Sequence, residues 1–240
     1  MQAIENPLQH SIGAVNVGSS VLAVRYKDGV MIAADTAISY GSMRKEKDAR
    51  RIKKLNDELI YASSGEMADF QNLQKLLEKK YQDDSIEQDG ATFFKPRDYF
   101  NWVSRNNYQR RLKMDPLWCM TVLAGYDKTA DEFFLGQVDL YGTRIEANFL
   151  HTGLSAHFCQ VLMQNAWKPD MTEDEARKLM CDCQRVLFYR DKKAYDKLQI
   201  ATVTKAGVTL HEPITVDTEW SLSFYKEKTN EFWRPARIHL

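Results

Sequence analysis

The first place in the sequence where chemistry could occur is the dipeptide Gly18-Ser19. A flexible glycine here precedes a small hydroxyl at the start of a strand candidate, and Asp35 ends the second strand of the same hairpin. A serine hydroxyl acts as a nucleophile only where a neighbouring group takes up its proton. Ser19 is therefore either a working nucleophile or the remnant of one, and its neighbours must decide between the two.

The cysteines are a second set of side chains with chemistry of their own: Cys119, Cys159, Cys181 and Cys183. Four cysteines in 240 residues do not resemble a disulfide scaffold. Cys181 and Cys183 lie two apart in a helical pattern, which points them to different faces, and no histidine lies near them in the sequence. We therefore expect buried, reduced thiols, no metal site and no cofactor.

Composition and charge indicate a globular chain that is long enough for one large domain. Hydrophobic residues make up 44% and charged residues 28%, and the formal net charge is +0, so bulk charge favours neither nucleic acid nor membrane. No apolar run approaches the roughly 20 residues that a membrane span requires. The N-terminal stretch lacks the basic start and apolar core of a secretory signal. We expect a protein of the cytoplasm and nucleus.

A basic segment, made of Arg105, Arg110, Arg111 and Lys113, leaves two interpretations open. The first is an RNA-binding module, but a nucleic-acid footprint requires a basic face without an equal acidic balance, and no aromatic platform motif accompanies this segment. The second, favoured interpretation is a subunit contact that involves Arg110 and Arg111.

The sequence predicts groups of strands separated by pairs of helices, and these elements must position the residues above. Asp-Gly at residues 28 and 29 predicts a hairpin between two apolar strands. Apolar residues at helical spacing begin at Met67, Pro96 opens a second helix, and Thr172 with Glu175 forms a capping box at the start of a fourth. The predicted strands are 20–26, 30–35, 58–64, 118–126, 133–142, 144–153, 198–204 and 207–213, and the segment 81–90 is predicted as a polar loop.

This order predicts an α+β fold rather than a simple alternating parallel sheet. Two antiparallel sheets packed face to face, with a helix pair on each outer face, bury every apolar stripe and give a four-layer α-β-β-α sandwich. We predict an N-terminal extension over 1–18, one domain over 19–217 and a C-terminal arm over 218–240. The arm is rich in exposed aromatic candidates, which usually mark interfaces: Trp220, Phe224, Tyr225, Phe232 and Trp233.

Several segments together carry a resemblance to a known family. The hairpin GSSVLAVRYKDGVMIAADT resembles the opening of proteasome beta-type subunits, which are N-terminal nucleophile hydrolases. Further similar segments are YGS at 40–42, ASSGEMADFQ at 62–71, YRD at 189–191 and LQIATVT at 198–204, and they follow in the family's order. The segment YQRRLKMDPLW at 108–118 is most similar to the type-4 subgroup, which occupies the seventh position of the beta ring.

The resemblance implies a particular site. In active members, cleavage after a glycine exposes a threonine whose hydroxyl attacks the peptide carbonyl, while its own amino group or a lysine moves the proton. A strand-end aspartate, an oxyanion glycine, a further aspartate and two serines complete the set. The corresponding residues here are Gly18 before the cut, Ser19 for the threonine, Asp35 and Asp191 for the aspartates, Gly65 for the oxyanion glycine, Arg51 for the lysine, and Gly153 and Ala194 for the serines.

The departures from the family pattern favour an inactive subunit. A guanidinium keeps its proton, so Arg51 cannot shuttle one, and we expect it to be an ion-pair partner of Asp35. Two supporting hydroxyls are also replaced. Catalytic groups that act together do not lose activity in proportion to their number, so several losses at once predict no useful turnover. Each residue also has an ordinary structural interpretation: Asp35 as a partner of local backbone, Gly65 at a strand–helix junction, and Asp191 as a helix-end partner of an arginine. An active peptidase that uses Ser19 is the alternative.

As a non-catalytic subunit, the chain is expected to act in assembly. The resemblance implies partners among the alpha and beta subunits of a stacked-ring particle for protein degradation, and no nucleic acid, membrane or cofactor. It also implies that the C-terminal arm contacts the opposite beta ring. A short extension is expected to stay in front of Ser19, with trimming near His10-Ser11.

Overall fold

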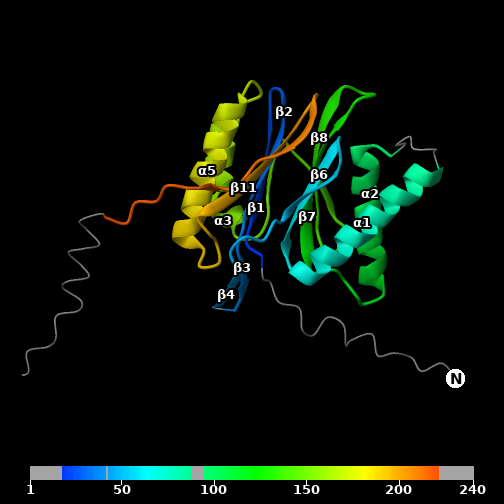
Figure 1. Ribbon diagram of the computed structural model, residues 1–240, viewed down its shortest axis with the longest axis horizontal. Helices are drawn as coiled ribbons and strands as arrows, with labels where there is room; N and C mark the ends of the chain where they lie inside the picture. Colours follow the sequence, from blue (N-terminus) through cyan, green and yellow to red (C-terminus); the bar gives the residue numbers. More distant parts are fainter. Residues whose placement is uncertain (1–17, 42, 88–93, 222–240) are drawn as a thin grey trace, which may run out of the picture.

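The structure is a computed structural model, and it describes residues 18–41, 43–87 and 94–221. Two β-sheets lie face to face in the middle of the molecule, and helices cover the outer face of each (Figure 1). The predicted α+β sandwich of four layers is therefore confirmed. The domain boundaries predicted after residues 18 and 217 stay predictions, and most of the predicted extension and arm lies outside the described residues.

The first sheet is built around the N-terminal hairpin. Its path is β10-β1-β2-β11-β12, and β13 pairs with β11; every pairing is antiparallel. Leu198 on β11 faces Asp35 on β2, which brings the C-terminal part of the domain against the end of the hairpin. The strands of this sheet are β1 (Val21–Tyr26), β2 (Gly29–Asp35), β10 (Phe149–His151), β11 (Lys197–Thr204), β12 (Gly207–Leu210) and β13 (Ile214–Thr215).

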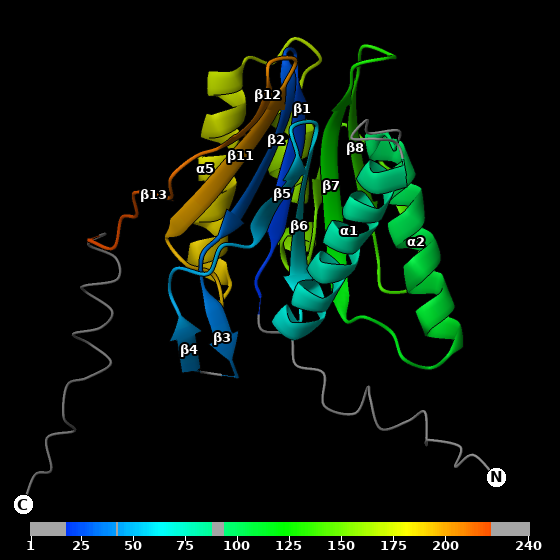
Figure 2. The same ribbon diagram turned by 45° about the vertical axis from the view of Figure 1, so that its right-hand side comes forward.

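The second sheet has the order β5-β6-β7-β8-β9. It consists of β5 (Ile52–Asn56), β6 (Leu59–Gly65), β7 (Cys119–Asp127), β8 (Glu132–Val138) and β9 (Arg144–Glu146). A separate hairpin of β3 (Ile38–Tyr40) and β4 (Met43–Glu46) extends from one end of the molecule (Figure 2). Strands β3, β4 and β5 were not predicted, because their polar and basic residues lack the apolar alternation of a half-buried strand.

Three apolar layers hold these elements together. Residues of both sheets meet in the central layer, which includes Val21, Ile32 and Val122. The helices α1 (Met67–Glu87) and α2 (Pro96–Leu112) bury aromatic and aliphatic side chains against the second sheet. On the first sheet lie α5 (Glu173–Arg190) and two short helices, α3 (Ser155–Phe158) and α4 (Gln160–Ala166). No helix in the described part of the chain is long and apolar enough to span a membrane.

Helix α5 begins where the sequence predicts. The Glu175 amide donates to Thr172 Oγ1 at 3.3 Å, and the Thr172 amide donates to the Glu175 carboxylate at 2.9 Å, which completes the capping box. The single helix predicted before it is instead two helices that meet at Cys159.

Two boundaries were predicted wrongly in the middle of the chain. The predicted loop 81–90 is helical as far as Glu87, because the stretch contains no glycine or proline before Gly90 and Lys80 forms an ion pair with Asp84 one turn further on. The predicted strand 144–153 is two strands, β9 and β10, that belong to different sheets. Between them the Asn148 carbonyl accepts a hydrogen bond from the Arg25 amide at 2.7 Å, which aligns β10 with β1.

The first hairpin turns one residue earlier than predicted. Lys27 and Asp28 form the turn, and Gly29 is already part of β2, opposite Tyr26. A Cβ atom at Gly29 would lie 2.4 Å from the Val203 carbonyl oxygen, so glycine here permits the close approach of β11.

The cysteines are free in the structure, as expected from the sequence. Cys119, Cys159 and Cys183 are buried, but Cys181 is only half-buried, so the expectation of four buried thiols was wrong for this residue. Cys181 lies on α5 two positions before Cys183, and helical positions two apart point to different faces, so both cannot face the same sheet.

Candidate functional site

Ser19 is a nearly buried residue that directly precedes β1. Its hydroxyl donates a hydrogen bond to Asp35 Oδ1 at 2.7 Å, and its side chain also receives one from Arg51 Nη2 at 3.4 Å. Asp35 stands at the end of β2, which pairs with β1 in register, so the hairpin itself brings the two side chains together. Within the described residues, these are the only hydrogen bonds of the Ser19 hydroxyl.

Arg51 fills the space beside this pair and is 1% exposed. It forms a buried ion pair with Asp35, as the sequence predicts. Its guanidinium also donates to backbone carbonyl oxygens of both neighbouring strands: Ser19 at 2.9 Å, Ser20 at 3.1 Å, Asp35 at 3.2 Å and Ser63 at 3.2 Å. A planar group with five donors suits this set of acceptors, whereas a lysine ammonium with three donors does not. The side chain thus connects both sheets at one point.

The Asp35 side chain is buried, and its carboxylate has three partners from different parts of the chain. Besides Ser19 and Arg51, the Tyr195 amide donates to Asp35 Oδ2 at 2.9 Å from a segment 160 positions away. Burial raises the pKa of the Asp35 carboxyl, and the contacts from Arg51, Ser19 and Tyr195 oppose that rise. These three contacts fix the orientation of the Asp35 carboxylate beside Ser19 and Arg51.

The peptide unit before Ser19 is part of the sheet structure. The Gly18 amide donates to the Gly65 carbonyl at 2.9 Å, and Gly18 forms antiparallel bridges with both Gly65 and Ile38. A Cβ atom at Gly18 would lie 3.3 Å from Arg51 Nη1, so a glycine leaves space for the guanidinium. Gly18 is thus positioned by the same strands that carry the site.

Gly65 ends β6 in a backbone conformation that favours glycine. Its φ is +109°, and an added Cβ would lie 2.3 Å from the Trp118 carbonyl oxygen. The residue stands between β6 and α1, as the structural interpretation predicts, and it also faces Gly18 across the bridge. A role in oxyanion binding stays a prediction.

The structure brings Asp191 and Gly153 to the same cleft as Ser19. Asp191 caps the C-terminus of α5, and its carboxylate accepts from the Lys193 amide at 2.9 Å rather than from an arginine. Gly153 has a φ of +65°, a conformation in which a serine would be strained. Ala194 is buried just beyond this cleft, and its carbonyl accepts a hydrogen bond from Arg44. Their descent from catalytic positions stays a prediction.

Some partners in the site could not be recognised from residue types. The Tyr195 amide and the carbonyls of Ser20 and Ser63 are backbone groups, which every residue carries. Thr152 is a further example, because its hydroxyl accepts from the Val21 amide at 2.9 Å and fixes the start of β1. The one sequence signal for these partners was the YRD triplet at 189–191, which lies four residues before Tyr195 and predicted that this segment is part of the site.

The predicted interface residues are only partly described. Trp220 is 61% exposed and packs edge-on against Tyr189 and Phe188 of α5, with ring centroids 5.1 and 6.0 Å away. Phe224, Tyr225, Phe232 and Trp233 lie outside the described residues. On α2, Arg110 forms an ion pair with Asp115 at 2.7 Å, and the Arg111 guanidinium lies 5.8 Å from the Tyr141 ring centroid. These contacts leave the interface role of both arginines a prediction.

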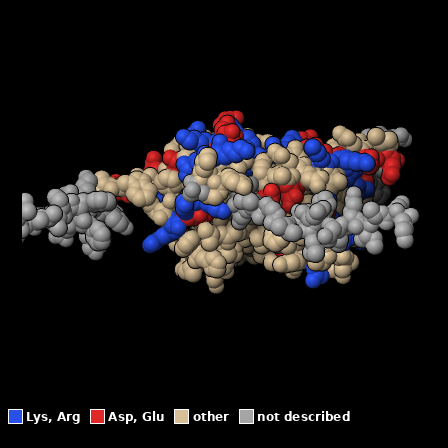
Figure 3. Space-filling view, turned by 90° about the horizontal axis from the view of Figure 1, so that it is seen from below, with Lys and Arg blue, Asp and Glu red and all other residues tan. Residues whose placement is uncertain are grey.

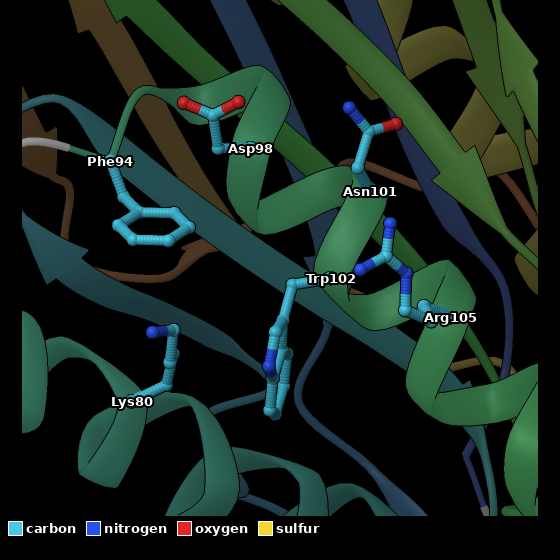
Figure 4. Close-up of a pocket in the computed structure, with 6 residues that line it drawn as sticks. All are labelled: Lys80, Phe94, Asp98, Asn101, Trp102 and Arg105. Carbon is cyan, nitrogen blue, oxygen red and sulfur yellow. The ribbon is translucent and has the colours of Figure 1, made fainter.

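A second pocket lies between α1 and α2 (Figure 4). Its aromatic walls are Phe94 and Trp102, and the Lys80 ammonium lies 4.3 Å from the Phe94 ring centroid. Lys80 is paired with Asp84, and the Asp98 carboxylate accepts from the Lys95 amide as part of the α2 start. Lys80 and Asp98 thus have structural tasks, so this pocket is a weaker candidate than the cleft at Ser19.

The charge distribution on one face and the possible metal ligands among the described residues can also be compared with the cleft at Ser19. In the view of Figure 3, Lys and Arg side chains are interspersed with Asp and Glu, and no broad basic face appears on that side. Among the described residues, no group of three or more His, Cys, Asp or Glu side chains is placed to hold a metal ion.

Comparisons with known proteins agree with the resemblance. Residues 15–203 match the family described as proteasome subunit. A protein of Xenopus laevis named proteasome subunit beta type-4 is 36% identical over 219 residues, which cover 90% of this chain and 89% of that protein. The protein of the same name from Arabidopsis thaliana is 34% identical and covers 95% of this chain and 92% of its own length. In Schizosaccharomyces pombe, a probable proteasome subunit beta type-7 is 34% identical over 92% of this chain.

Proposed function

The chain belongs to the proteasome subunit family, and from that membership we propose that it is a beta subunit of the type-4 kind that cleaves no peptide itself. Its task is to complete the beta ring and to help two half-particles join. The similarity to proteins named beta type-4 supports the subgroup, since it covers about nine-tenths of both chains.

The observation that carries this proposal is the position of Arg51. A working serine requires a group beside its hydroxyl that can take up and return a proton, and the place of the family's lysine is taken by a guanidinium that is bound to Asp35 and to four carbonyls. The Ser19 hydroxyl donates to a carboxylate whose charge Arg51 already neutralises. The group that stands beside Ser19 therefore stabilises the strand ends and moves no proton.

The decisive experiment compares assembled particles with wild-type chain and with Ser19→Ala. We expect equal rates of cleavage for fluorogenic peptides with basic, acidic and apolar residues before the scissile bond. An electrophilic peptide that labels N-terminal nucleophiles is expected to leave this chain unlabelled, and its reaction with other subunits is the positive control. Loss of one cleavage activity in Ser19→Ala, or labelling at Ser19, would establish the active-peptidase alternative.

The same proposal predicts the form of the mature N-terminus. Ser19 as an internal residue has an amide instead of an amine, so we propose that a short extension remains in front of it after trimming near His10-Ser11. N-terminal sequencing of the chain from assembled particles tests this point. A sequence that starts at Ser19 contradicts it.

For assembly, we propose that the chain contacts alpha and beta subunits and that its C-terminal arm reaches the opposite beta ring. The exposed Trp220 supports this proposal, because 61% of it remains accessible where it packs against α5. Deletion of residues 221–240 is expected to slow the joining of half-particles in native gels, and unchanged joining contradicts the arm. We also propose residence in the cytoplasm and nucleus, which cell fractionation tests.

A further inference from the structure

The segment that follows β13 runs beside α5 (Figure 1). Up to Val216 it is fixed by the first sheet, because β13 pairs with β11 and the Val216 amide donates to the Asp196 carbonyl at 2.8 Å. Residues 217–221 belong to no helix or strand, and we call them the strap. The position of the strap therefore depends on its contacts with α5.

Two side chains of α5 hold the strap by its backbone. Arg185 Nε donates to the Asp217 carbonyl at 2.8 Å. The Tyr189 hydroxyl accepts from the Glu219 amide at 2.6 Å and donates to the Glu219 carbonyl at 3.3 Å. Arg185 and Tyr189 are four positions apart, so they lie on the same face of the helix. Because both bind backbone groups, the attachment does not depend on the side chains of the strap.

The next residue of the strap, Trp220, is held as an exposed aromatic side chain. Its ring meets Tyr189 and Phe188 edge-on, and its indole Nε1 donates to Thr218 Oγ1 at 3.1 Å. Tryptophan is enriched among the residues that contribute most to binding at interfaces. A side chain that is already fixed loses little conformational freedom when a partner covers it. The strap thus presents a preorganised contact at the start of the C-terminal arm.

We propose that Tyr189 is the positioning residue of the C-terminal arm: its hydroxyl fixes the strap, and the strap holds Trp220 ready to enter an apolar pocket of the partner. The inference rests on the proposed function in one respect, because that partner is the subunit of the opposite beta ring that the arm reaches. Without the hydroxyl, the five residues of the strap become part of the free chain and add up to about 17 Å of unguided length. The arm must then be ordered during docking, which costs conformational entropy.

Hydrogen exchange of the purified full chain tests the attachment of the strap. Tyr189→Phe keeps the aromatic ring and removes both hydrogen bonds to Glu219. We expect the Glu219 amide to exchange roughly tenfold faster than in the parent, because it loses its acceptor. The Val216 amide is the internal reference, and its exchange is expected to stay unchanged because its acceptor belongs to the domain.

Tyr108→Phe is the matched control for this experiment. Tyr108 is an exposed tyrosine of α2, and its hydroxyl has no hydrogen-bond partner within the described ranges. This variant is expected to exchange like the parent at both amides. Unchanged exchange at Glu219 in Tyr189→Phe overturns the inference. An equal rise at Val216 overturns it as well, since the whole domain would then be less stable and the strap would not be released by itself.

The rate at which half-particles join, measured in native gels, connects the strap to the arm. Tyr189→Phe is expected to slow joining a few-fold, and by less than deletion of residues 221–240 does. If the deletion slows joining and Tyr189→Phe does not, the strap does not position the arm and the inference is overturned. If the deletion itself has no effect, the arm in the proposed function is refuted, whereas the exchange at Glu219 still decides whether the hydroxyl fixes the strap.

Discussion

Replacing Arg51 by methionine removes the buried cation of the site while it keeps an unbranched, apolar side chain over the first part of the arginine's path. The carboxylate of Asp35 retains the Ser19 hydroxyl and the Tyr195 amide but loses its counter-charge, and four carbonyl oxygens lose a donor. Breaking a buried ion pair by removing one partner costs about 3–5 kcal/mol. A domain of this kind unfolds with about 5–15 kcal/mol, so we expect Arg51→Met to lose a large part of its stability.

The loss is also expected to depend on pH. Burial raises the pKa of Asp35 and Arg51 opposes the rise, so in the variant the pKa rises further. A carboxyl whose folded pKa lies above its unfolded value adds stability below the unfolded pKa and loses it as pH rises. The difference in unfolding free energy between parent and Arg51→Met is therefore expected to be larger at neutral pH than at mildly acidic pH.

Urea unfolding of the purified chain, followed by tryptophan fluorescence, measures both effects. Arg50→Met is the matched control, since Arg50 is the next residue and its ion pairs with Asp48 and Glu212 are at the surface. We expect this control to change stability by roughly 0–1 kcal/mol. If Arg51→Met costs no more than Arg50→Met, the guanidinium does not hold the strand ends together and the reasoning about the site fails.

Three further predictions concern other parts of the chain. The Lys168 ammonium and the Thr172 amide lower the pKa of Glu175 to about 2. The ionised carboxylate therefore adds stability above its unfolded pKa, and this stability is lost as pH falls toward about 2. Glu175→Gln is expected to weaken this loss of thermal stability at acidic pH, as thermal unfolding at several pH values measures. Gly65→Ala is expected to lower the free energy of unfolding by more than about 3 kcal/mol and to abolish soluble expression, because its Cβ would meet the Trp118 carbonyl. Gly41 also has a positive φ but open space around it, so Gly41→Ala is expected to cost about 1–2 kcal/mol. Similar losses in the two variants contradict the clash at Gly65. Native alkylation with mass spectrometry is expected to modify the half-buried Cys181 before the other three cysteines, and faster labelling of a buried one refutes this.

Local signals in the sequence predicted the parts of the fold that depend on local chemistry. The capping box at Thr172 sets the start of α5 because its two hydrogen bonds involve residues three apart. Apolar spacing after Gly65 predicted α1, although its polar end was missed, because a helix needs only one buried stripe. The split of 144–153 into β9 and β10 was missed although Asn148, a common turn residue, lies between the two strands, because the division depends on which sheet each half meets.

In the site, contacts between side chains were predictable from the sequence, whereas contacts to backbone groups were not. The ion pair of Arg51 with Asp35 was predicted from opposite charges at related positions, and the structure contains it. Residue types did not reveal that Arg51 also binds four carbonyls, because backbone acceptors leave no trace in the sequence. Of the turn after α5 the sequence pointed only to the YRD triplet, and the fold places the next residues, Lys192 and Lys193, in the same cleft as Ser19.

The strand order of the first sheet has a consequence for how the chain is made. The hairpin β1–β2 leaves the ribosome first, yet it occupies the centre of its sheet, and both of its neighbours are encoded far downstream, at β10 and β11. At about 5–20 residues per second, several seconds of synthesis separate the hairpin from each partner. During that interval the hairpin has two unpaired edges rich in alanine, valine and isoleucine, which are prone to pair with other chains. The nascent subunit therefore needs shielding until β11 has been translated, and a ribosome stalled before Lys197 would expose an aggregation-prone intermediate.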